Sequence, residues 1–304
     1  MNQINNKLIY KFLGKINFNY NIGKRTWFGT GGKCLIFFEP SNIKQLFFFL
    51  KIIPRKFPFF IFGLGSNILF RDGKFNGAVI KLGAEFKKIE LNKKKKIIKV
   101  GCGVKDIDLA NFCLNNSISS FEFLVGIPGT LGGAIRMNSS CFNGCISDNL
   151  KSITVMDSKR ELKKINKDEI KFDYREIKLP KDYIFLEAEF FVNFKNKIKI
   201  KEKMKNIKNL RKKNQPFGVR TGGSTFKNPE QVKAWELIDK IGFRGKKYNN
   251  AIISKKHPNF FINVGNASSL ELEILGEDVK NKVKDKTGIK LFWEIERVGN
   301  FEKF

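Results

Sequence analysis

Three side chains, a serine, an arginine and a glutamate, have the types and local settings that catalysis requires. Ser224 lies in G-G-S-T-F-K-N-P, Arg175 in F-D-Y-R and Glu294 in L-F-W-E-I-E-R. A nucleophilic serine would need a base, yet His257 is the single histidine and G-x-S-x-G does not occur, which disfavours a hydrolase triad. A serine on a glycine turn can instead give a proton to a substrate, and we expect this chemistry of Ser224.

Arg175 and Glu294 have an alternative interpretation as ordinary charged residues on the surface. In an extended strand, however, Glu294 would share a face with the apolar Phe292. We expect that face to be partly buried, which would raise the pKa of the Glu294 carboxyl because burial disfavours its charged form.

Three glycine turns precede these residues, at Gly63–Asn67, Gly101–Val104 and Gly126–Asn138. The last reads G-I-P-G-T-L-G-G-A-I-R-M-N, and its interleaved apolar residues distinguish it from a Gly/Ser linker. Glycines let the main chain approach a ligand closely, and unhindered amides suit a pyrophosphate. Each turn alone could be an ordinary connection, but together they favour a large phosphorylated cofactor.

The first turn, G-L-G-S-N, differs from a dinucleotide fingerprint of the Rossmann type. It lacks the third glycine, and an apolar run at 68–70 follows it where the fingerprint would open a helix. We therefore expect a phosphate-type loop set between strands, which is a different architecture.

The charge of the chain is extreme, with 58 Lys and Arg against 29 Asp and Glu in 304 residues, a formal charge of +29. Such a balance suggests a nucleic-acid partner. The basic residues are dispersed, however. The chain also uses Lys, Phe, Ile and Asn heavily, and all four are encoded by A/T-rich codons. We favour compositional bias over nucleic-acid binding, and expect a field that helps to attract anionic small molecules.

The five cysteines form an odd set without C-x-x-C, and the single histidine cannot complete a metal site, so no metal is expected. They indicate reduced thiols in a cytoplasmic protein. The amino terminus lacks the apolar core of a signal peptide, and charged residues and a proline interrupt the apolar stretch 46–64. We expect a soluble protein of two domains or three small ones.

Apolar patterning predicts a mixture of strands and helices. Strands are expected at 35–38, 59–62, 68–70, 78–82, 97–100, 153–156, 184–194, 260–263 and 290–298. Helices are expected at 42–51 (capped by Ser41), 106–115, 200–213, 231–241 and 270–286, with the third as the domain joint.

Six motifs in order make the chain resemble the UDP-N-acetylenolpyruvoylglucosamine reductases across nearly its whole length. Besides G-L-G-S-N, the long glycine loop, F-D-Y-R and G-G-S-T-F-K-N-P, they include T-W-F-G-T-G-G (Thr26–Gly32), K-H-P-N-F-F-I-N (Lys256–Asn263) and E-I-E-R-V-G (Glu294–Gly299). The resemblance implies an α+β chain with a two-part FAD-binding fold of the vanillyl-alcohol-oxidase/PCMH type, at 1–72 and 73–205. A C-terminal α/β substrate-binding domain would follow at 206–304.

The resemblance also implies an FAD-dependent oxidoreductase, a UDP-N-acetylmuramate dehydrogenase of peptidoglycan synthesis. NADPH would reduce non-covalent FAD and leave, and UDP-N-acetylglucosamine enolpyruvate would then enter and be reduced to UDP-N-acetylmuramate. The partners would be these small molecules, with no nucleic acid and no membrane.

Residue roles follow from the same motif matches. Ser224 would protonate C2 of the enolpyruvyl group, while Arg175 and Glu294 would stabilise the enolate-like intermediate. The expected flavin-binding residues are Gly63, Gly65, Ser66, Asn67, Gly126, Ile127, Pro128, Gly129, Thr130, Gly132, Gly133 and Asn138. The candidate substrate-binding residues are Tyr174, Asn228, Arg220, Lys227 and Lys256, the last three for the diphosphate.

Two departures from the family pattern stand out. Ile177 occupies the place of the serine in Y-R-x-S, and the short span from Arg175 to Ser224 resembles the subclass without the inserted tyrosine loop. Two rival interpretations remain, a flavin oxidase of the same fold acting on another alcohol or amine, and a nucleic-acid-binding protein. His257 has no assigned role, and a structural hydrogen bond is as good an expectation for it as any other.

Overall fold

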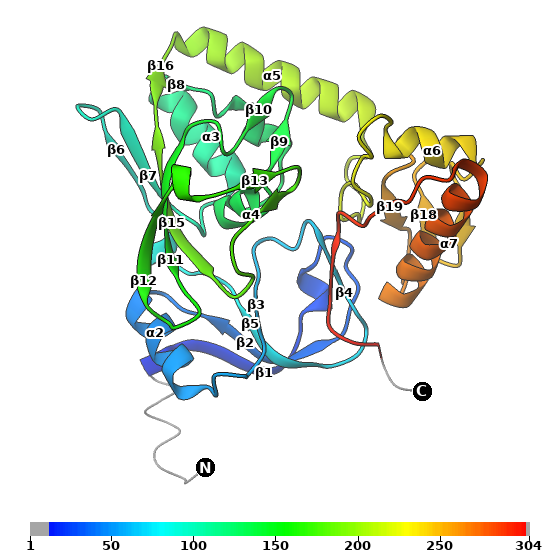
Figure 1. The fold of residues 1–304 in the computed structure, drawn as a ribbon, viewed down its shortest axis with the longest axis horizontal. Coiled ribbons are helices and arrows are strands. Elements are labelled where there is room, and N and C mark those ends of the chain that lie inside the picture. The colour runs from blue at the N-terminus through cyan, green and yellow to red at the C-terminus, as the bar shows by residue number, and fades with distance from the viewer. Residues whose placement is uncertain (1–11, 302–304) are drawn as a thin grey trace. The chain divides into compact units, whose positions relative to one another are not determined.

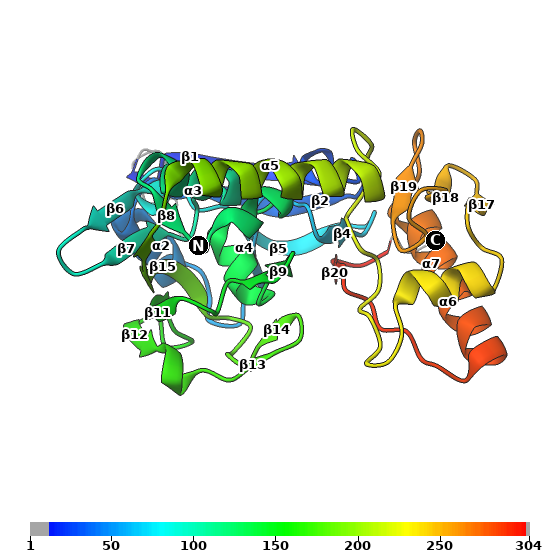
Figure 2. The same cartoon turned by 90° about the horizontal axis from the view of Figure 1, so that it is seen from above.

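The computed structural model describes residues 12–301, which fall into two units built from interleaved stretches of chain (Figures 1 and 2). Unit 1 comprises the chain up to Phe18, Ile36–Gly63 and Gly77–Asn209. Unit 2 comprises Asn19–Leu35, Leu64–Asn76 and the chain from Leu210 onward. The chain therefore passes between the units five times, after residues 18, 35, 63, 76 and 209.

The centre of unit 1 is a five-stranded antiparallel sheet in the order β12-β11-β15-β7-β6. Its strands are β6 (Ile89–Asn92), β7 (Ile97–Gly101), β11 (Leu150–Met156), β12 (Leu162–Asn166) and β15 (Ile184–Phe191). In β15 the buried Leu186, Ala188 and Phe190 alternate with the more exposed Glu187 and Glu189. This period of two places one face of the sheet against an apolar core.

Helices α3 (Asp106–Asn115) and α4 (Leu131–Arg136) belong to the same core. Their buried apolar side chains are Leu109, Ala110, Cys113, Leu131, Ala134 and Ile135. The long glycine segment, expected as a loop throughout, thus ends in a short helix. The apolar residues interleaved with its glycines explain this, since Leu131 and Ile135 lie one helical turn apart and are both buried.

A second sheet, in the order β1-β2-β5-β3, contains three strands that cross the division between the units. Its strands are β1 (Lys15–Asn21), β2 (Lys33–Glu39), β3 (Phe59–Ile61) and β5 (Phe75–Ile80). Helix α2 (Ile43–Ile52) joins β2 to β3, which lies parallel to β5. The prediction of Ser41 as the helix cap was wrong, because the Asn42 side chain accepts the Gln45 amide and caps α2.

Unit 2 is built around two helices and two small sheets. The helices are α6 (Ala234–Lys240) and α7 (Ser269–Thr287), beside the antiparallel strands β17 (Lys247–Tyr248), β18 (Ala251–Ile253) and β19 (Phe261–Asn263). Strands β4 (Ile68–Phe70) and β20 (Glu296–Val298) form a parallel pair. All three tryptophans, Trp27, Trp235 and Trp293, lie in this unit.

Two sets of hydrogen bonds stabilise the amino-terminal end of helix α7. Ser268 and Glu271 form a reciprocal capping box. The carboxylate of Asp72, distant in sequence but in the same unit, accepts the amides of Ser269 and Leu270 at 3.1 Å and the Ser269 hydroxyl at 2.7 Å. The amino-terminal stretch 64–76 is thereby bound to the carboxyl-terminal helix.

Short elements complete the described chain. The strands are β8 (Ile118–Ser119), β9 (Ser140–Cys141), β10 (Gly144–Cys145), β13 (Phe172–Asp173), β14 (Glu176–Ile177) and β16 (Asn193–Phe194). The 3-10 helices are η1 (Gly23–Arg25), η2 (Glu85–Lys87), η3 (Glu122–Gly126) and η4 (Lys167–Glu169). Helix α5 (Lys197–Asn214) is the predicted lysine-rich helix, and it crosses the division between the units. In residues 12–301 no helix combines the length and the hydropathy needed to span a bilayer.

Candidate active site

The predicted site residues are divided between the two units. Unit 1 holds Gly63, Gly126, Ile127, Pro128, Gly129, Thr130, Gly132, Gly133, Asn138, Tyr174 and Arg175. Unit 2 holds Gly65, Ser66, Asn67, Arg220, Ser224, Lys227, Asn228, Lys256 and Glu294.

In unit 1 the long glycine loop is fastened to the second glycine turn. The amide of Leu131 donates to the Val104 carbonyl and the amide of Gly132 to the Cys102 carbonyl, both at 2.9 Å. The turn at Gly101–Val104 therefore supports the loop through the backbone. These two loop amides are engaged within the protein and are not the donors that a phosphate would use.

Other amides of the glycine segments have no acceptor in the described chain, namely those of Gly63, Gly129 and Thr130. A Cβ on Gly63 would lie 2.7 Å from the Thr130 hydroxyl oxygen, so the first glycine turn and the long loop adjoin within unit 1. A Cβ on Gly129 would meet Asp106 Oδ2 at the same distance. Backbone donors without side chains to shield them fit the diphosphate of a dinucleotide.

Asp106, a residue that sequence reasoning missed, lies directly under this loop. It is fully buried, its amide donates to the Gly129 carbonyl at 3.0 Å, and neither carboxyl oxygen has a hydrogen-bond partner within residues 12–301. Burial raises the pKa of this carboxyl well above its ordinary value. The available signal was its position just beyond the second glycine turn, after Lys105 and at the start of a predicted helix.

Arg175 is held at the tip of the β13–β14 hairpin in unit 1. Its backbone is left-handed, with φ of 58°. Its Nη1 donates to Ser140 Oγ at 2.7 Å, and its guanidinium lies 5.2 Å from the centroid of the half-exposed Tyr174 ring. Asn138, at the end of the glycine segment, donates to the Asp173 carbonyl at 3.1 Å and ties the hairpin to that segment.

Ile177, which replaces the serine of the family pattern, is only 3% exposed and belongs to the unit 1 core. It pairs with Phe172 across the hairpin. The side chain therefore packs against apolar neighbours, where a serine hydroxyl would need a buried partner.

In unit 2 the segments that carry Ser224 and Glu294 are bonded to each other. The Thr225 carbonyl accepts the Glu294 amide at 2.9 Å, and Ser224 itself pairs with Phe260 in an antiparallel bridge. Asn67 completes the group, because its Nδ2 donates to the Glu294 carbonyl at 3.0 Å. The end of the first glycine turn thus adjoins the serine and glutamate segments.

The prediction that Phe292 lies on a partly buried face was wrong, since its side chain is 65% exposed. The reason is that β20 begins only at Glu296, so the chain before it is irregular and does not present alternating faces of a strand. Glu294 is half-buried. Its neighbour Trp293 points inward, donates to Glu277 at 2.7 Å and packs so closely on α7 that a Cβ at Gly276 would collide with its ring.

The three cations expected at a diphosphate all lie in unit 2, and within residues 12–301 none forms an ion pair. Arg220 donates to the Gly265 carbonyl at 3.0 Å, and Lys256 donates to the Lys212 carbonyl at 2.6 Å. The amide of Lys227 donates to the Phe292 carbonyl at 2.8 Å. Asn228 accepts the Ala234 amide at 3.0 Å, at the beginning of α6.

His257 is half-buried against the rings of Phe260 and Trp235. Its Nδ1 has no hydrogen-bond partner in the described chain. Burial lowers the pKa of this imidazole, and the nearby Arg244 lowers it further. The environment therefore favours a neutral histidine packed among aromatic rings.

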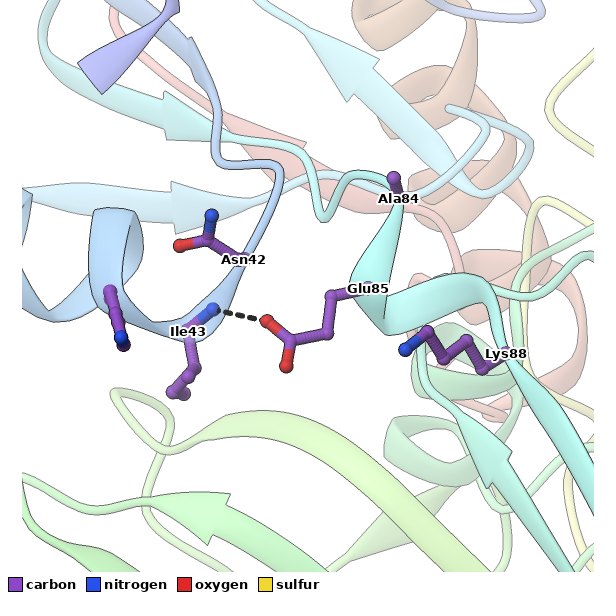
Figure 3. A pocket seen from close by; sticks show the side chains of 6 residues that line it. Asn42, Ile43, Ala84, Glu85 and Lys88 are labelled. Atoms are coloured by element: carbon purple, nitrogen blue, oxygen red, sulfur yellow. Dashed lines mark hydrogen bonds between the residues drawn. The ribbon is translucent and has the colours of Figure 1, made fainter. Parts of the chain in front are cut away.

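A hollow of about 450 Å³ lies elsewhere in unit 1 and contains none of the predicted site residues (Figure 3). Its lining residues are Asn42, Ile43, Lys44, Ala84, Glu85 and Lys88. Glu85 accepts the Ile43 amide at 2.7 Å, so a carboxylate of the protein already occupies the start of α2. Within residues 12–301, His, Cys, Asp and Glu side chains nowhere gather in threes that could hold a metal ion.

Comparisons with known proteins bear on both parts of the chain. Residues 35–166 match the model of the FAD binding domain family, and residues 215–298 match that of the UDP-N-acetylenolpyruvoylglucosamine reductase C-terminal domain. The α+β chain therefore contains an FAD-binding domain followed by a reductase C-terminal domain.

Similar proteins cover nearly all of the chain. The UDP-N-acetylenolpyruvoylglucosamine reductase of Rickettsia prowazekii (strain Madrid E) is 45% identical over 288 residues, which are 95% of this chain and 97% of that protein. The same enzyme of Rickettsia bellii (strain RML369-C) is 46% identical over 94% of each chain. The crystal structure of the reductase from Thermus caldophilus matches with a TM-score of 0.81 and 27% identity, over 93% of this chain and 98% of that one. The chain thus belongs to the UDP-N-acetylenolpyruvoylglucosamine reductase family, FAD-binding oxidoreductases of peptidoglycan synthesis.

Proposed function

We propose that this protein uses NADPH and non-covalently bound FAD to reduce UDP-N-acetylglucosamine enolpyruvate to UDP-N-acetylmuramate. The observation that carries the proposal is the junction in unit 2, where Thr225 links the Ser224 turn to the Glu294 segment at 2.9 Å. A proton donor and a carboxyl group held on one backbone junction suit a reaction in which charge develops beside the carbon that is protonated.

The glycine segments hold the cofactor through their backbone. The amides of Gly63, Gly129 and Thr130 would donate to the diphosphate of FAD, and Gly65, Ser66, Asn67 and the rest of the long loop would line the dinucleotide. Bound FAD supplies hydride transfer, from NADPH and then to C3 of the enolpyruvyl group.

Hydride addition at C3 would push negative charge toward C2 and the enolpyruvyl carboxylate, where Arg175 would provide a permanent cation and a protonated Glu294 a hydrogen-bond donor. Ser224 would then give its hydroxyl proton to C2, which discharges the intermediate. Electrostatic groups of this kind contribute roughly 3–4 kcal/mol each to stabilisation of the transition state. Tyr174 and Asn228 contact the substrate, and Arg220, Lys227 and Lys256 bind its diphosphate, a role that their lack of acidic partners within residues 12–301 supports.

The site of action that we propose is the cytoplasm, where NADPH is available and cysteines remain reduced. All five cysteines are free, and Cys34, Cys102 and Cys113 are buried. This pattern fits a reducing compartment.

The test is Ser224→Ala in a stopped-flow experiment that separates the two halves of the reaction. The purified variant should be yellow, release flavin on denaturation and be reduced by NADPH at the normal rate. Its reoxidation by the enolpyruvyl substrate should be roughly 10²–10⁴-fold slower, because the general acid is missing.

Ser158→Ala is the matched control, since Ser158 is an exposed serine in the turn after β11. It should reoxidise at the wild-type rate. If Ser224→Ala also reoxidises normally, Ser224 is not the proton donor and the proposed mechanism fails.

A further inference from the structure

The segment that carries Ser224 resembles a central strand with an incomplete neighbour. On one side, Phe226 pairs with Trp293 and Thr225 is bonded to Glu294. On the other side, Ser224 pairs with Phe260, and the chain before Phe260 contains Pro258. A proline has no amide hydrogen, so backbone pairing cannot continue along that side.

The side chain of Asn259 supplies the missing pairing. Its Nδ2 donates to the Phe226 carbonyl at 2.8 Å, and its Oδ1 accepts the Phe226 amide at 2.9 Å. Its own carbonyl accepts the Thr225 amide at 2.7 Å. One carboxamide therefore acts as a peptide group toward Phe226, which holds both polar groups of a buried backbone residue.

Asn259 is itself only 3% exposed, and both ends of its carboxamide are used by Phe226. Its hydrogen-bonding groups are therefore used within the protein, and we assign it no contact with substrate. The bonds lie one and two residues beyond Ser224, on the strand that also reaches Glu294 through Thr225. Any shift of this strand moves the serine and its carboxyl neighbour together.

We propose that Asn259 is a positioning residue that fixes the Ser224 turn for proton transfer. This rests on the proposed role of Ser224. A displacement of about 1 Å in a reacting group can cost roughly 100-fold in rate, so a clamp this close to the acid has a measurable kinetic effect. Only Asn fits the pattern with the right length, because Asp lacks the donor and Gln is one methylene longer.

The experiment is a double-mutant cycle between Asn259→Asp and Ser224→Ala in the full-length protein. Asn259→Asp keeps the shape but turns a carboxylate oxygen toward the Phe226 carbonyl. Alone, it should slow flavin reoxidation by the enolpyruvyl substrate about 30-fold, while flavin content, NADPH reduction and substrate affinity stay within twofold. In the Ser224→Ala background it should have less than a twofold effect, because the acid that it positions is absent.

Asn263→Asp is the matched control. Asn263 is another buried carboxamide of unit 2, but its side chain bonds to Phe28, Gly265 and Ala267 and forms no hydrogen bond with residues 224–226 in the described chain. Whatever loss it causes should be the same with and without Ser224. Asn259→Ala enters the same cycle if Asn259→Asp does not fold, with the same expectation.

Equal losses from Asn259→Asp in both backgrounds would overturn the inference, as would a loss confined to substrate affinity. These outcomes differ from failure of the proposed function, in which Ser224→Ala alone already reoxidises at the wild-type rate.

Discussion

The two units form their parts of the site in different ways. In unit 1 the glycine loop is fixed by backbone bonds to Cys102 and Val104, and the loop donors of Gly129 and Thr130, which have no acceptor in the part of the chain that the structure describes, are amides. In unit 2 the Ser224 turn is fixed by the side-chain carboxamide of Asn259, and the Glu294 carbonyl by that of Asn67. A site made of backbone is sensitive to added volume, whereas a site made with side chains is sensitive to the exact groups that are present.

Among the substitutions that compare the two units, Gly129→Val should have the largest effect, which is a loss of FAD affinity. The added side chain would meet Asp106 in unit 1, where the carboxyl is fully buried. We expect the loop to relieve this overpacking, which costs about 3 kcal/mol, by leaving the position that binds FAD, so FAD affinity should fall roughly 100-fold. Titration of free FAD, followed by its fluorescence, measures the change.

The explanation for Gly129→Val can itself be tested. Adding Asp106→Ala removes the atoms that the new side chain would meet, and should recover part of the lost FAD affinity. Tryptophan fluorescence should be unchanged in both variants, because all three tryptophans lie in unit 2. If the double variant binds FAD no better than the single one, steric contact with Asp106 is not the cause.

A smaller effect, on stability, is expected from Asp72→Ala. The carboxylate accepts two amides and a hydroxyl at the beginning of α7, and loss of such a cap costs about 1–2 kcal/mol. The urea midpoint of tryptophan fluorescence should fall accordingly.

Asp157→Ala is the counterpart in unit 1, where the carboxylate accepts the Lys159 and Glu161 amides in a turn. If the units unfold separately, it should leave the tryptophan transition unchanged. Equal shifts from both variants would mean that the units unfold as one, and the distinction between them would not extend to stability.

The smallest effect concerns pH and His257. Burial depresses its folded-state pKa below the ordinary value of 6.5, so the unfolded chain binds the proton more readily. Well above pH 6.5 the residue is neutral in both states and has no effect, while stability falls as the pH drops through that value. His257→Leu should therefore lose less stability between pH 7.5 and 5.5 than the wild type, as judged from urea midpoints. An equal loss in both proteins would show that His257 does not contribute.

The sequence predicted the regular elements of this fold better than its irregular ones. The helix at 106–115 has the predicted bounds, and the helices at 200–213 and 270–286 differ from α5 and α7 by only a few residues at their ends. The strand expected at 290–298 shrinks to three residues, because contacts of Trp293 with α7 override its extended pattern. The three-part domain division stays a prediction.

For the site, the sequence identified candidates but not the residues that support them. Motifs named Ser224, Glu294 and the glycine loop, and their roles remain predictions. Asp106 and Asn259 were missed because their importance depends on burial and on contacts between segments far apart in sequence. Asn259 lies inside the recognised K-H-P-N-F-F-I-N motif, so attention to the proline before it could have suggested a substitute for backbone pairing.

The five passages of the chain between the units have a consequence for synthesis on the ribosome. Residues 19–35 and 64–76 are synthesised before their partners in unit 2, which lie beyond residue 210, and β4 must wait for β20, which follows much later in the sequence. Until then the apolar Ile68, Leu69 and Phe70 have no strand to pair with. Nascent chains stalled before residue 290 should therefore be the species that chaperones retain.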